Sequence, residues 1–363
     1  MTDMEQTYAV ILAGGRGERF WPLSTSKRPK QLVSLVGDET LLAQAVNRLD
    51  GLIPPERVFV ITNADLVEAS REAAPALPPE NVIGEPIGRD TAAAVALAAA
   101  LVGAKSEAAS FCILTADHIM GDLEVYRASL RESLRLAQNQ DVLITIGITP
   151  TEPSSGYGYI ETGDPAEVCE GIRFFHAKRF VEKPDRETAA GYLKSGKYYW
   201  NSGMFVWSVR SLYTALQSHR PPLADLIDDL KPVIGTPQFA DRLAEAYAGL
   251  EKISIDYAVM EKANNILMVQ GTFAWDDVGA WPALENHFER NVDGNVVIGD
   301  CQSVDAAGNI VFSKDRLTAL IGVTDLVVVQ TDGVTLICPR DRAQDVKRMV
   351  EKLRQTGRHD QWV

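Results

Sequence analysis

A glycine-rich loop with several cations follows the first apolar run of the chain. It reads Gly14-Gly15-Arg16-Gly17-Glu18-Arg19 and is followed by Lys27-Arg28-Pro29-Lys30-Gln31. Glycines at the end of a strand let backbone N–H groups approach an anion closely, because no side chain blocks them. Residues 13–31 contain five Lys or Arg and one acid, whereas the whole chain has a formal charge of −13. The loop therefore predicts a binding site for a phosphate-rich ligand.

Two common phosphate-binding motifs do not describe this loop. A Rossmann fingerprint needs a third glycine where this chain has Phe20, and a Walker A loop needs a Gly-Lys-Ser/Thr ending that does not follow. The remaining alternative is a solvated, Gly-rich turn with scattered charges. The density of cations favours the phosphate site over that turn.

Two aspartates are candidate metal ligands. Asp117 comes just after the apolar run Phe111–Thr115, and open α/β sheets bind ligands in the crevice outside their strand ends. Asp277 lies 160 residues later, in Trp275-Asp276-Asp277-Val278-Gly279. Metal sites on phosphates use one or two protein carboxylates and leave other positions to phosphate oxygens and water. Each aspartate alone could equally be a turn or helix-cap residue, so the metal hypothesis depends on the pair.

Two short motifs in the middle of the chain carry groups suited to a sugar phosphate. They are Glu182-Lys183-Pro184 and Asn201-Ser202-Gly203. A carboxylate can accept hydrogen bonds from two sugar hydroxyls, a lysine can neutralise a monophosphate, and an asparagine both donates and accepts. The alternative for each motif taken alone is a surface salt bridge or a turn.

A further carboxylate, Glu85, precedes an alanine-rich segment in Glu85-Pro86-Ile87-Gly88-Arg89-Asp90-Thr91. Asp90 or Thr91 would cap a helix well, so part of this motif is a helix start. Glu85 is not explained in that way. A carboxylate can accept hydrogen bonds from N1–H and the N2 amino group of guanine, a pairing that adenine cannot supply. Glu85 is therefore a candidate for base selection.

The elements that must position these residues alternate between short β-branched runs and alanine- or leucine-rich stretches. We predict strands at Tyr8–Ala13, Val58–Thr62, Phe111–Thr115 and Val142–Ile148, and helices at Leu41–Leu49, Ala64–Ala74, Thr91–Ala104 and Leu123–Gln138. Such alternation predicts an α/β fold with a parallel sheet covered on both faces.

The pattern changes after about Asn291, to short runs punctuated by Gly and Asp. We predict strands at Asn295–Ile298, Asn309–Phe312, Leu317–Gly322, Leu326–Gln330 and Thr335–Cys338, followed by an amphipathic helix at Ala343–Arg354. We therefore expect a first domain over residues 1–288 and a small β-rich domain over residues 289–363. We expect the second to make packing or subunit contacts and to carry no chemistry, and a homodimer is the expected assembly.

Composition excludes several classes of function. With 36 Lys and Arg against 49 Asp and Glu, the chain is a poor candidate for binding nucleic acid or an anionic membrane. Its longest apolar run, Ala92–Val102, has 11 residues, too few to span a bilayer. Four cysteines lie far apart without a Cys-x-x-Cys pair, so we expect a protein of the reducing cytoplasm.

Taken in order, the motifs resemble those of the mannose-1-phosphate guanylyltransferase family, also called GDP-mannose pyrophosphorylases. The resemblance rests on the first loop with Arg-Pro-Lys-Gln, Glu-Pro-x-Gly-Arg-Asp-Thr-Ala, Ala-Asp-His, Gly-Tyr-Gly-Tyr-Ile-Glu, Glu-Lys-Pro, Trp-Asn-Ser-Gly-Met-Phe and Trp-x-Asp-Val-Gly. It covers nearly the whole chain. It implies a Rossmann-like nucleotidyltransferase domain with a mixed, mostly parallel sheet, a short β-helix-like domain, Mg²⁺, GTP and mannose 1-phosphate.

The resemblance also implies roles for particular residues of this chain. The catalytic set is Arg19, Lys30 and Lys183, and the metal ligands are Asp117 and Asp277. The nucleotide-binding set is Ala13, Gly14, Gly15, Arg16, Gly17, Glu85, Arg89 and Thr91. The sugar-phosphate-binding set is Gly158, Glu182, Lys183 and Asn201.

Two departures from the family pattern stand out. The chain has Asp90 and Ala93 where the family usually has Asn and Pro. Longer family members carry a cupin-type isomerase domain, and the residues after the transferase part are too few for one, so we expect no isomerase activity. Two competing functions are the same chemistry with another hexose 1-phosphate or base, and a non-catalytic sensor of sugar nucleotides. The sensor is disfavoured because Lys30, Asp117 and Asp277 are all present.

Overall fold

The computed structural model describes residues 4–363. These residues form two compact units. The sheet unit comprises residues 4–14, 45–116 and 120–275. The loop unit comprises residues 15–44, 117–119 and 276–363. The glycine-rich loop from Gly15 onward thus shares a compact unit with residues 289–363, whereas the sequence pattern placed those two segments in different domains. Each unit is described by itself.

The sheet unit is built on nine strands in the order β3-β2-β1-β4-β9-β6-β10-β8-β7. The pairs β3–β2, β2–β1, β1–β4 and β6–β10 are parallel, and β9 runs antiparallel to both β4 and β6. The strand bounds are β1 Thr7–Ala13, β2 Val58–Asn63, β3 Val82–Glu85, β4 Ser110–Thr115, β6 Leu143–Ile148, β7 Tyr159–Cys169, β8 Ile172–Val181, β9 Tyr198–Ser208 and β10 Ile266–Gly271.

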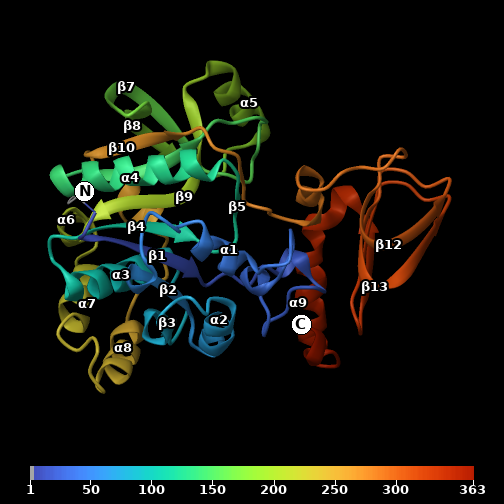
Figure 1. Ribbon diagram of the computed structural model, residues 1–363, viewed down its shortest axis with the longest axis horizontal. Helices are drawn as coiled ribbons and strands as arrows, with labels where there is room; N and C mark the ends of the chain where they lie inside the picture. Colours follow the sequence, from blue (N-terminus) through green and yellow to red (C-terminus); the bar gives the residue numbers. More distant parts are fainter. Residues whose placement is uncertain (1–3) are drawn as a thin grey trace. The chain divides into compact units, whose positions relative to one another are not determined.

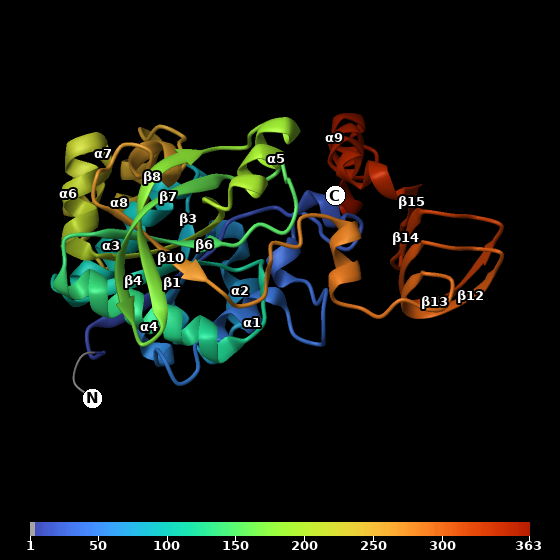
Figure 2. The ribbon, with the colours of Figure 1, turned by 90° about the horizontal axis from the view of Figure 1, so that it is seen from above.

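Helices cover both faces of this sheet (Figure 1). Buried residues of α3, α6 and α7 share one apolar cluster with β1 and β4, and α4 lies on the other side of these strands. Figure 2 shows α6 and α7 side by side. Alanine dominates α3, so this helix is buried almost all round. The helix bounds are α2 Val67–Ala73, α3 Thr91–Lys105, α4 Leu123–Asn139, α5 Arg186–Ser195, α6 Val209–His219, α7 Pro221–Leu230 and α8 Phe239–Ala248.

Three elements stand where the chain passes from one unit to the other. They are α1 (Leu41–Asn47) and the paired short strands β5 (Ile119–Met120) and β11 (Trp275–Asp276). Asp117 and Asp277 each lie within two residues of one of these short strands. Within residues 4–363, no helix combines the length and the apolar character needed to cross a membrane.

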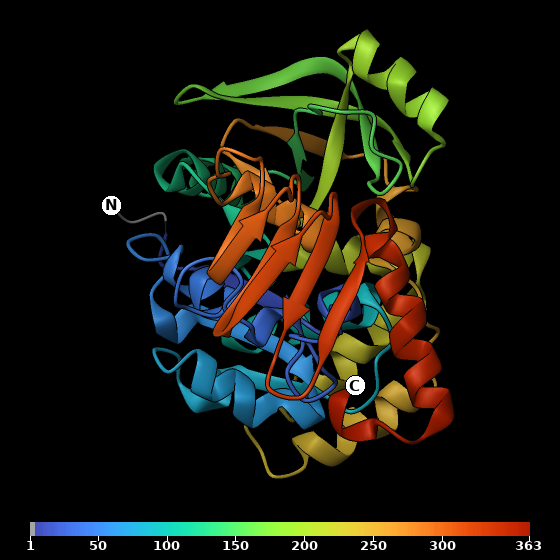
Figure 3. The ribbon, with the colours of Figure 1, turned by 90° about the vertical axis from the view of Figure 1, so that its right-hand side faces the viewer.

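The loop unit contains a four-stranded sheet and the terminal helix (Figure 3). The strands are β12 Val296–Val304, β13 Ile310–Ile321, β14 Leu326–Gln330 and β15 Thr335–Pro339, and the helix is α9 Val346–Thr356. The first three strands pair in parallel, as in a β-helix, and β15 is antiparallel. One apolar cluster joins Phe20, Trp21, Val33 and Leu35 of the loop segment to Trp281 and the inner faces of these strands.

The predicted fold class is confirmed, with corrections to individual strands. Two strands predicted at 309–312 and 317–322 form the single strand β13. Its pairing with β12 jumps from Ser313 opposite Gly299 to Thr318 opposite Cys301, so residues 314–317 form a bulge whose charges resemble a loop in sequence. Five strands of the larger sheet, β3, β7, β8, β9 and β10, were not predicted; β3 is short, and β7 and β8 are rich in polar residues.

Candidate active site

The glycine-rich loop is held in place by Lys30 and Ser24. Gly17 has φ +59°, and a Cβ at this position would come within 2.1 Å of the Lys30 Cβ atom. The Ser24 hydroxyl donates a hydrogen bond of 2.7 Å to the Gly17 carbonyl oxygen. Only glycine combines the left-handed backbone with this close approach. The motifs Gly-x-Gly and Arg-Pro-Lys-Gln are therefore parts of one packed structure.

Lys30 connects this loop to both candidate metal ligands. Lys30 is only 4% exposed. Its ammonium group donates hydrogen bonds to Asp117 Oδ2 at 3.1 Å and to the Asp277 carbonyl oxygen at 2.5 Å. Burial raises the pKa of the Asp117 carboxyl, but the charges of Lys30 and His118 and the Lys30 hydrogen bond outweigh it and hold that pKa below its ordinary value. Asp117 is therefore ionised at neutral pH, as a metal ligand must be.

A pocket of about 510 Å³ collects most of the charged residues singled out in the sequence. All of its lining lies within the loop unit. The structure brings together Arg16, Gly17 and Arg19 with Lys30, Asp117 and Asp277, from three separate stretches of the chain. The remaining lining residues are Glu18, Phe20, His118, Gly279 and Lys347.

The turn that carries Asp277 is strained and clamped. Val278 has φ +45°, a conformation that costs a β-branched residue energy. The Asp276 carboxylate accepts hydrogen bonds from Val278 N at 2.7 Å and Asn286 Nδ2 at 2.9 Å, and it lies 3.0 Å from His287 Nε2. A Cβ on Gly279 would stand only 3.3 Å from Asp277 Oδ2, so glycine leaves room for that carboxylate. Asp276 thus holds the turn, and Asp277 lines the pocket.

We expect the variant Asp276→Asn to lose stability. Either orientation of the new amide turns its NH₂ group toward a donor, so the variant's free energy of unfolding should fall by about 2 kcal/mol. Denaturant titration measures this change. Since the residue occupies the variable position of Trp-x-Asp-Val-Gly, the sequence pattern assigned it no such role. An unfolding midpoint equal to that of the wild type would show that the clamp is not needed.

Glu85 ends β3 in a buried site. Glu85 is 7% exposed, and the Tyr247 hydroxyl donates a hydrogen bond of 3.1 Å to Glu85 Oε1. Burial raises the pKa of Glu85 to about 7, the Tyr247 hydrogen bond opposes this change, and the charge of Asp90 adds to it. A Cβ on Gly14 would lie 3.7 Å from Glu85 Oε2, so the start of the loop is next to this carboxylate. Ala13, the last residue of β1, immediately precedes Gly14.

Arg89 and Thr91 have structural partners in the same unit. The Arg89 guanidinium donates to the carbonyl oxygens of Tyr247 at 3.1 Å and Ala248 at 2.7 Å, at the C-terminal end of α8. Thr91 Oγ1 accepts from Ile255 N at 2.9 Å. These contacts hold residues 247–255 against the start of α3, and Tyr247 is the residue that contacts Glu85. In the structure, both residues support the Glu85 site.

The predicted sugar-phosphate residues also come together. Gly158, Glu182 and Asn201 line one small pocket. A Cβ on Gly158 would lie 2.6 Å from Glu182 Oε2, so a larger residue there would displace the end of the Glu182 side chain. Lys183 has φ +43°, a strained conformation of the kind that gathers at functional sites, and its Nζ is 2.5 Å from Glu182 Oε1. Lys183 can therefore give up its ion pair with Glu182 and bind a phosphate instead.

Sequence reasoning missed three residues of these sites. Asp256 lines the Gly158 pocket and accepts a hydrogen bond of 2.8 Å from Asn201 Nδ2. Burial raises its pKa, the Asn201 hydrogen bond opposes this, and the nearby Glu182 charge adds to it. Tyr247 and Lys347 are the other two. A polar residue in a helix gives no signal of its tertiary partner, although Asp256 begins a π-helical turn, a feature frequent at functional sites.

Comparison with known proteins identifies the families that match this chain. The family described as "Nucleotidyl transferase" matches residues 8–293, and the "MannoseP isomerase/GMP-like beta-helix domain" matches residues 299–353. The mannose-1-phosphate guanylyltransferase of Escherichia coli K12 is 37% identical, over 98% of this chain and 75% of that protein. The one of Klebsiella pneumoniae is 37% identical, over 97% and 74%. A crystal structure from Thermus thermophilus, described as a mannose-1-phosphate geranyltransferase, has a TM-score of 0.86 at 37% identity and covers 96% of this chain and 99% of that one.

Proposed function

This chain belongs to the mannose-1-phosphate guanylyltransferase family of nucleotidyl transferases, and on that premise we propose that it converts GTP and mannose 1-phosphate into GDP-mannose and pyrophosphate. A phosphate oxygen of the sugar phosphate attacks the α-phosphorus of GTP. The bond from that phosphorus to the bridging oxygen breaks, and pyrophosphate leaves with the electron pair. A phosphomonoester is already ionised at pH 7, so this attack needs no general base.

The observation that carries the proposal is the Lys30 arrangement. One buried ammonium contacts Asp117 and the Asp277 backbone in a pocket that Arg16 and Arg19 also line. Phosphoryl transfer depends on positioning and on neutralising charge, and this pocket offers both. We assign Lys30 to the α-phosphate, and the backbone of Gly14–Gly17 with Arg16 and Arg19 to the β- and γ-phosphates.

The residues present fit Mg²⁺. Asp117 and Asp277 supply carboxylate oxygens to one pocket, and phosphate oxygens and water can complete the coordination of this ion. When bound, Mg²⁺ would neutralise the oxygens on which charge accumulates. Lys30 would keep Asp117 ionised and oriented.

The remaining roles fall to the sheet unit. We assign guanine to Glu85, and mannose 1-phosphate to Gly158, Glu182, Asn201 and Lys183, with Lys183 neutralising its phosphate. Asp90 adds negative charge beside the base site where the family usually has Asn. The cytoplasmic location and the homodimer stay predictions.

A panel of substrates tests the proposed function. Pyrophosphate release is measured with GTP or ATP, each combined with mannose 1-phosphate or glucose 1-phosphate. We expect GTP with mannose 1-phosphate to give the highest kcat/KM. Faster release with glucose 1-phosphate or with ATP would favour the alternative of another hexose or base. Binding of GDP-mannose without any pyrophosphate release would favour the sensor.

A further inference from the structure

The terminal helix places a lysine in the phosphate pocket. Lys347, the second residue of α9, lines the same pocket as Arg16, Arg19 and Lys30. Residues 289–363 were expected to contribute packing or subunit contacts only. A cation from this segment beside the glycine-rich loop indicates that the segment also takes part in binding the substrate.

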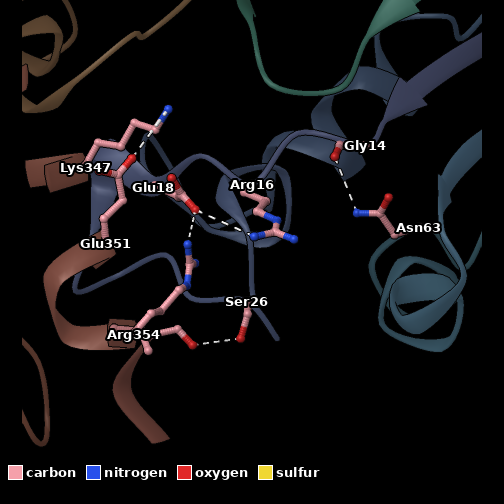
Figure 4. Close-up of polar contacts among 9 residues, drawn as sticks. Gly14, Arg16, Glu18, Ser26, Asn63, Lys347, Glu351 and Arg354 are labelled. Atoms are coloured by element: carbon pink, nitrogen blue, oxygen red, sulfur yellow. Dashed lines mark hydrogen bonds and ion pairs between the residues drawn. The ribbon is translucent and has the colours of Figure 1, made fainter. Parts of the chain in front are cut away.

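Helix α9 is attached to the loop through Glu18. Arg354 Nη1 donates to Glu18 Oε1 at 2.5 Å, and the Glu18 side chain is only 13% exposed (Figure 4). Lys347 and Arg354 are seven residues apart, which places them on the same side of a helix. On the buried side of α9, Val346 and Val350 pack in the apolar cluster that contains Phe20. The helix therefore holds Lys347 in a defined place beside the loop.

The present partner of Lys347 binds it weakly. Glu351 Oε1 lies 4.0 Å from its Nζ, one helical turn away, and both side chains are more than half exposed (Figure 4). Exposed pairs of this kind contribute about 0 to 1 kcal/mol, so Lys347 can turn to a phosphate at little cost.

Two of the charges that line the pocket, those of Lys30 and Glu18, are already engaged. Lys30 binds Asp117, and Arg354 binds Glu18. Among residues 4–363, the lining cations that form no hydrogen bond are Arg16, Arg19 and Lys347. Their combined charge suits pyrophosphate, which carries more negative charge once the bond to the α-phosphorus has broken.

We propose that Lys347 binds the β- and γ-phosphates of GTP and the pyrophosphate that leaves. This role rests on the proposed function for its place in the reaction, whereas binding of pyrophosphate itself can be measured without turnover. The C-terminal segment then supplies a residue that touches the substrate.

The test compares Lys347→Met with Lys352→Met. Both variants remove one exposed positive charge from α9, but Lys352 does not line this pocket. Calorimetric titration of the full chain with inorganic pyrophosphate and Mg²⁺, and separately with GMP, measures affinity. We expect Lys347→Met to weaken pyrophosphate binding about tenfold and to leave GMP binding unchanged. Lys352→Met should change neither, and Lys347→Arg should retain most of the affinity.

Turnover gives a second readout. In the reverse reaction, Lys347→Met should raise the KM for pyrophosphate about tenfold and leave the KM for GDP-mannose unchanged. Equal weakening of GMP and pyrophosphate, or pyrophosphate affinity equal to that of the wild type, would overturn the proposal. A wild type that makes no GDP-mannose, together with a Lys347→Met variant that loses pyrophosphate affinity, would refute the proposed function and support this inference.

Discussion

Replacing Asp277 with asparagine is expected to reduce turnover by about a thousandfold while leaving the fold intact. The amide keeps the shape of the side chain but loses the charge that would hold Mg²⁺ against the phosphates. Lys30 contacts the backbone carbonyl of Asp277, so that hydrogen bond survives the substitution. The measurement is the steady-state rate of pyrophosphate release, with denaturant unfolding as the check on the fold.

The neighbouring aspartate is the matched control for this experiment. Asp276→Asn should lower stability and reduce activity much less, because Asp276 clamps the turn and is no part of the pocket lining. Excess chelator should abolish wild-type turnover, and added Mg²⁺ should restore it. Full activity in chelator, or equal losses of activity from both substitutions, would rule out Asp277 as a ligand and with it the two-carboxylate site.

Replacing Glu85 with glutamine is expected to reduce the preference for GTP over ATP by about 10- to 100-fold. A carboxylate accepts from both guanine donors, whereas a glutamine amide offers one acceptor and one donor, which suits adenine better. Tyr247 can still donate to the remaining oxygen, so the site should keep its shape. The ratio of kcat/KM for the two nucleotides measures the effect.

The same substitution should stabilise the protein at alkaline pH. The pKa of Glu85 is raised from 4.5 to about 7, so between these values the native state holds a proton that the unfolded state has lost. Stability therefore falls as the pH rises through this window. At about 1.4 kcal/mol per pH unit, Glu85→Gln should be more stable than the wild type by up to about 3 kcal/mol at pH 8, and the difference should shrink toward pH 5.

Binding of GDP-mannose, measured across the same pH range, separates the effect of Glu85 ionisation on base binding from its effect on stability. Its phosphates do not titrate there, so weaker binding by the wild type below pH 7 would report the protonation of Glu85. Tyr247→Phe removes a hydrogen bond that lowers the pKa of Glu85, and should move this loss of affinity to higher pH. A wild-type affinity that does not vary between pH 5.5 and 8.5 would contradict the assignment of Glu85 to the base.

Periodicity and local chemistry predicted the parts of this molecule that depend on neighbours in sequence. The buried run predicted at Tyr8–Ala13 and the alanine-rich helix predicted at Thr91–Ala104 appear as β1 and α3. Gly17 and Lys30 were singled out by residue type together with the family motifs, and the structure explains their spacing by direct packing. Motifs of this kind can be recognised in a sequence because glycines and clustered cations each have few structural roles.

Residues whose roles depend on distant partners were not predictable in this way. Lys347 is one of several exposed charges on an amphipathic helix, and only its place beside Arg16 and Arg19 distinguishes it from Lys352. Tyr247 is an ordinary helical aromatic until it meets Glu85, 162 residues earlier in the chain. The strands β7 and β8 are half-exposed, so they lack the apolar alternation that would have revealed them.

The discontinuous loop unit also determines the order in which the protein can assemble during synthesis. Residues 15–44 leave the ribosome early, but their apolar partners Trp281, Phe312 and Val327 are made roughly 240 to 310 residues later. Until then, Phe20 and Trp21 have no core to enter, and contacts of such long range form slowly. The sheet unit needs residues only up to 275 and can form before synthesis ends. We therefore expect the phosphate loop, although it is made early in translation, to become ordered only after β12–β15 and α9 have been made.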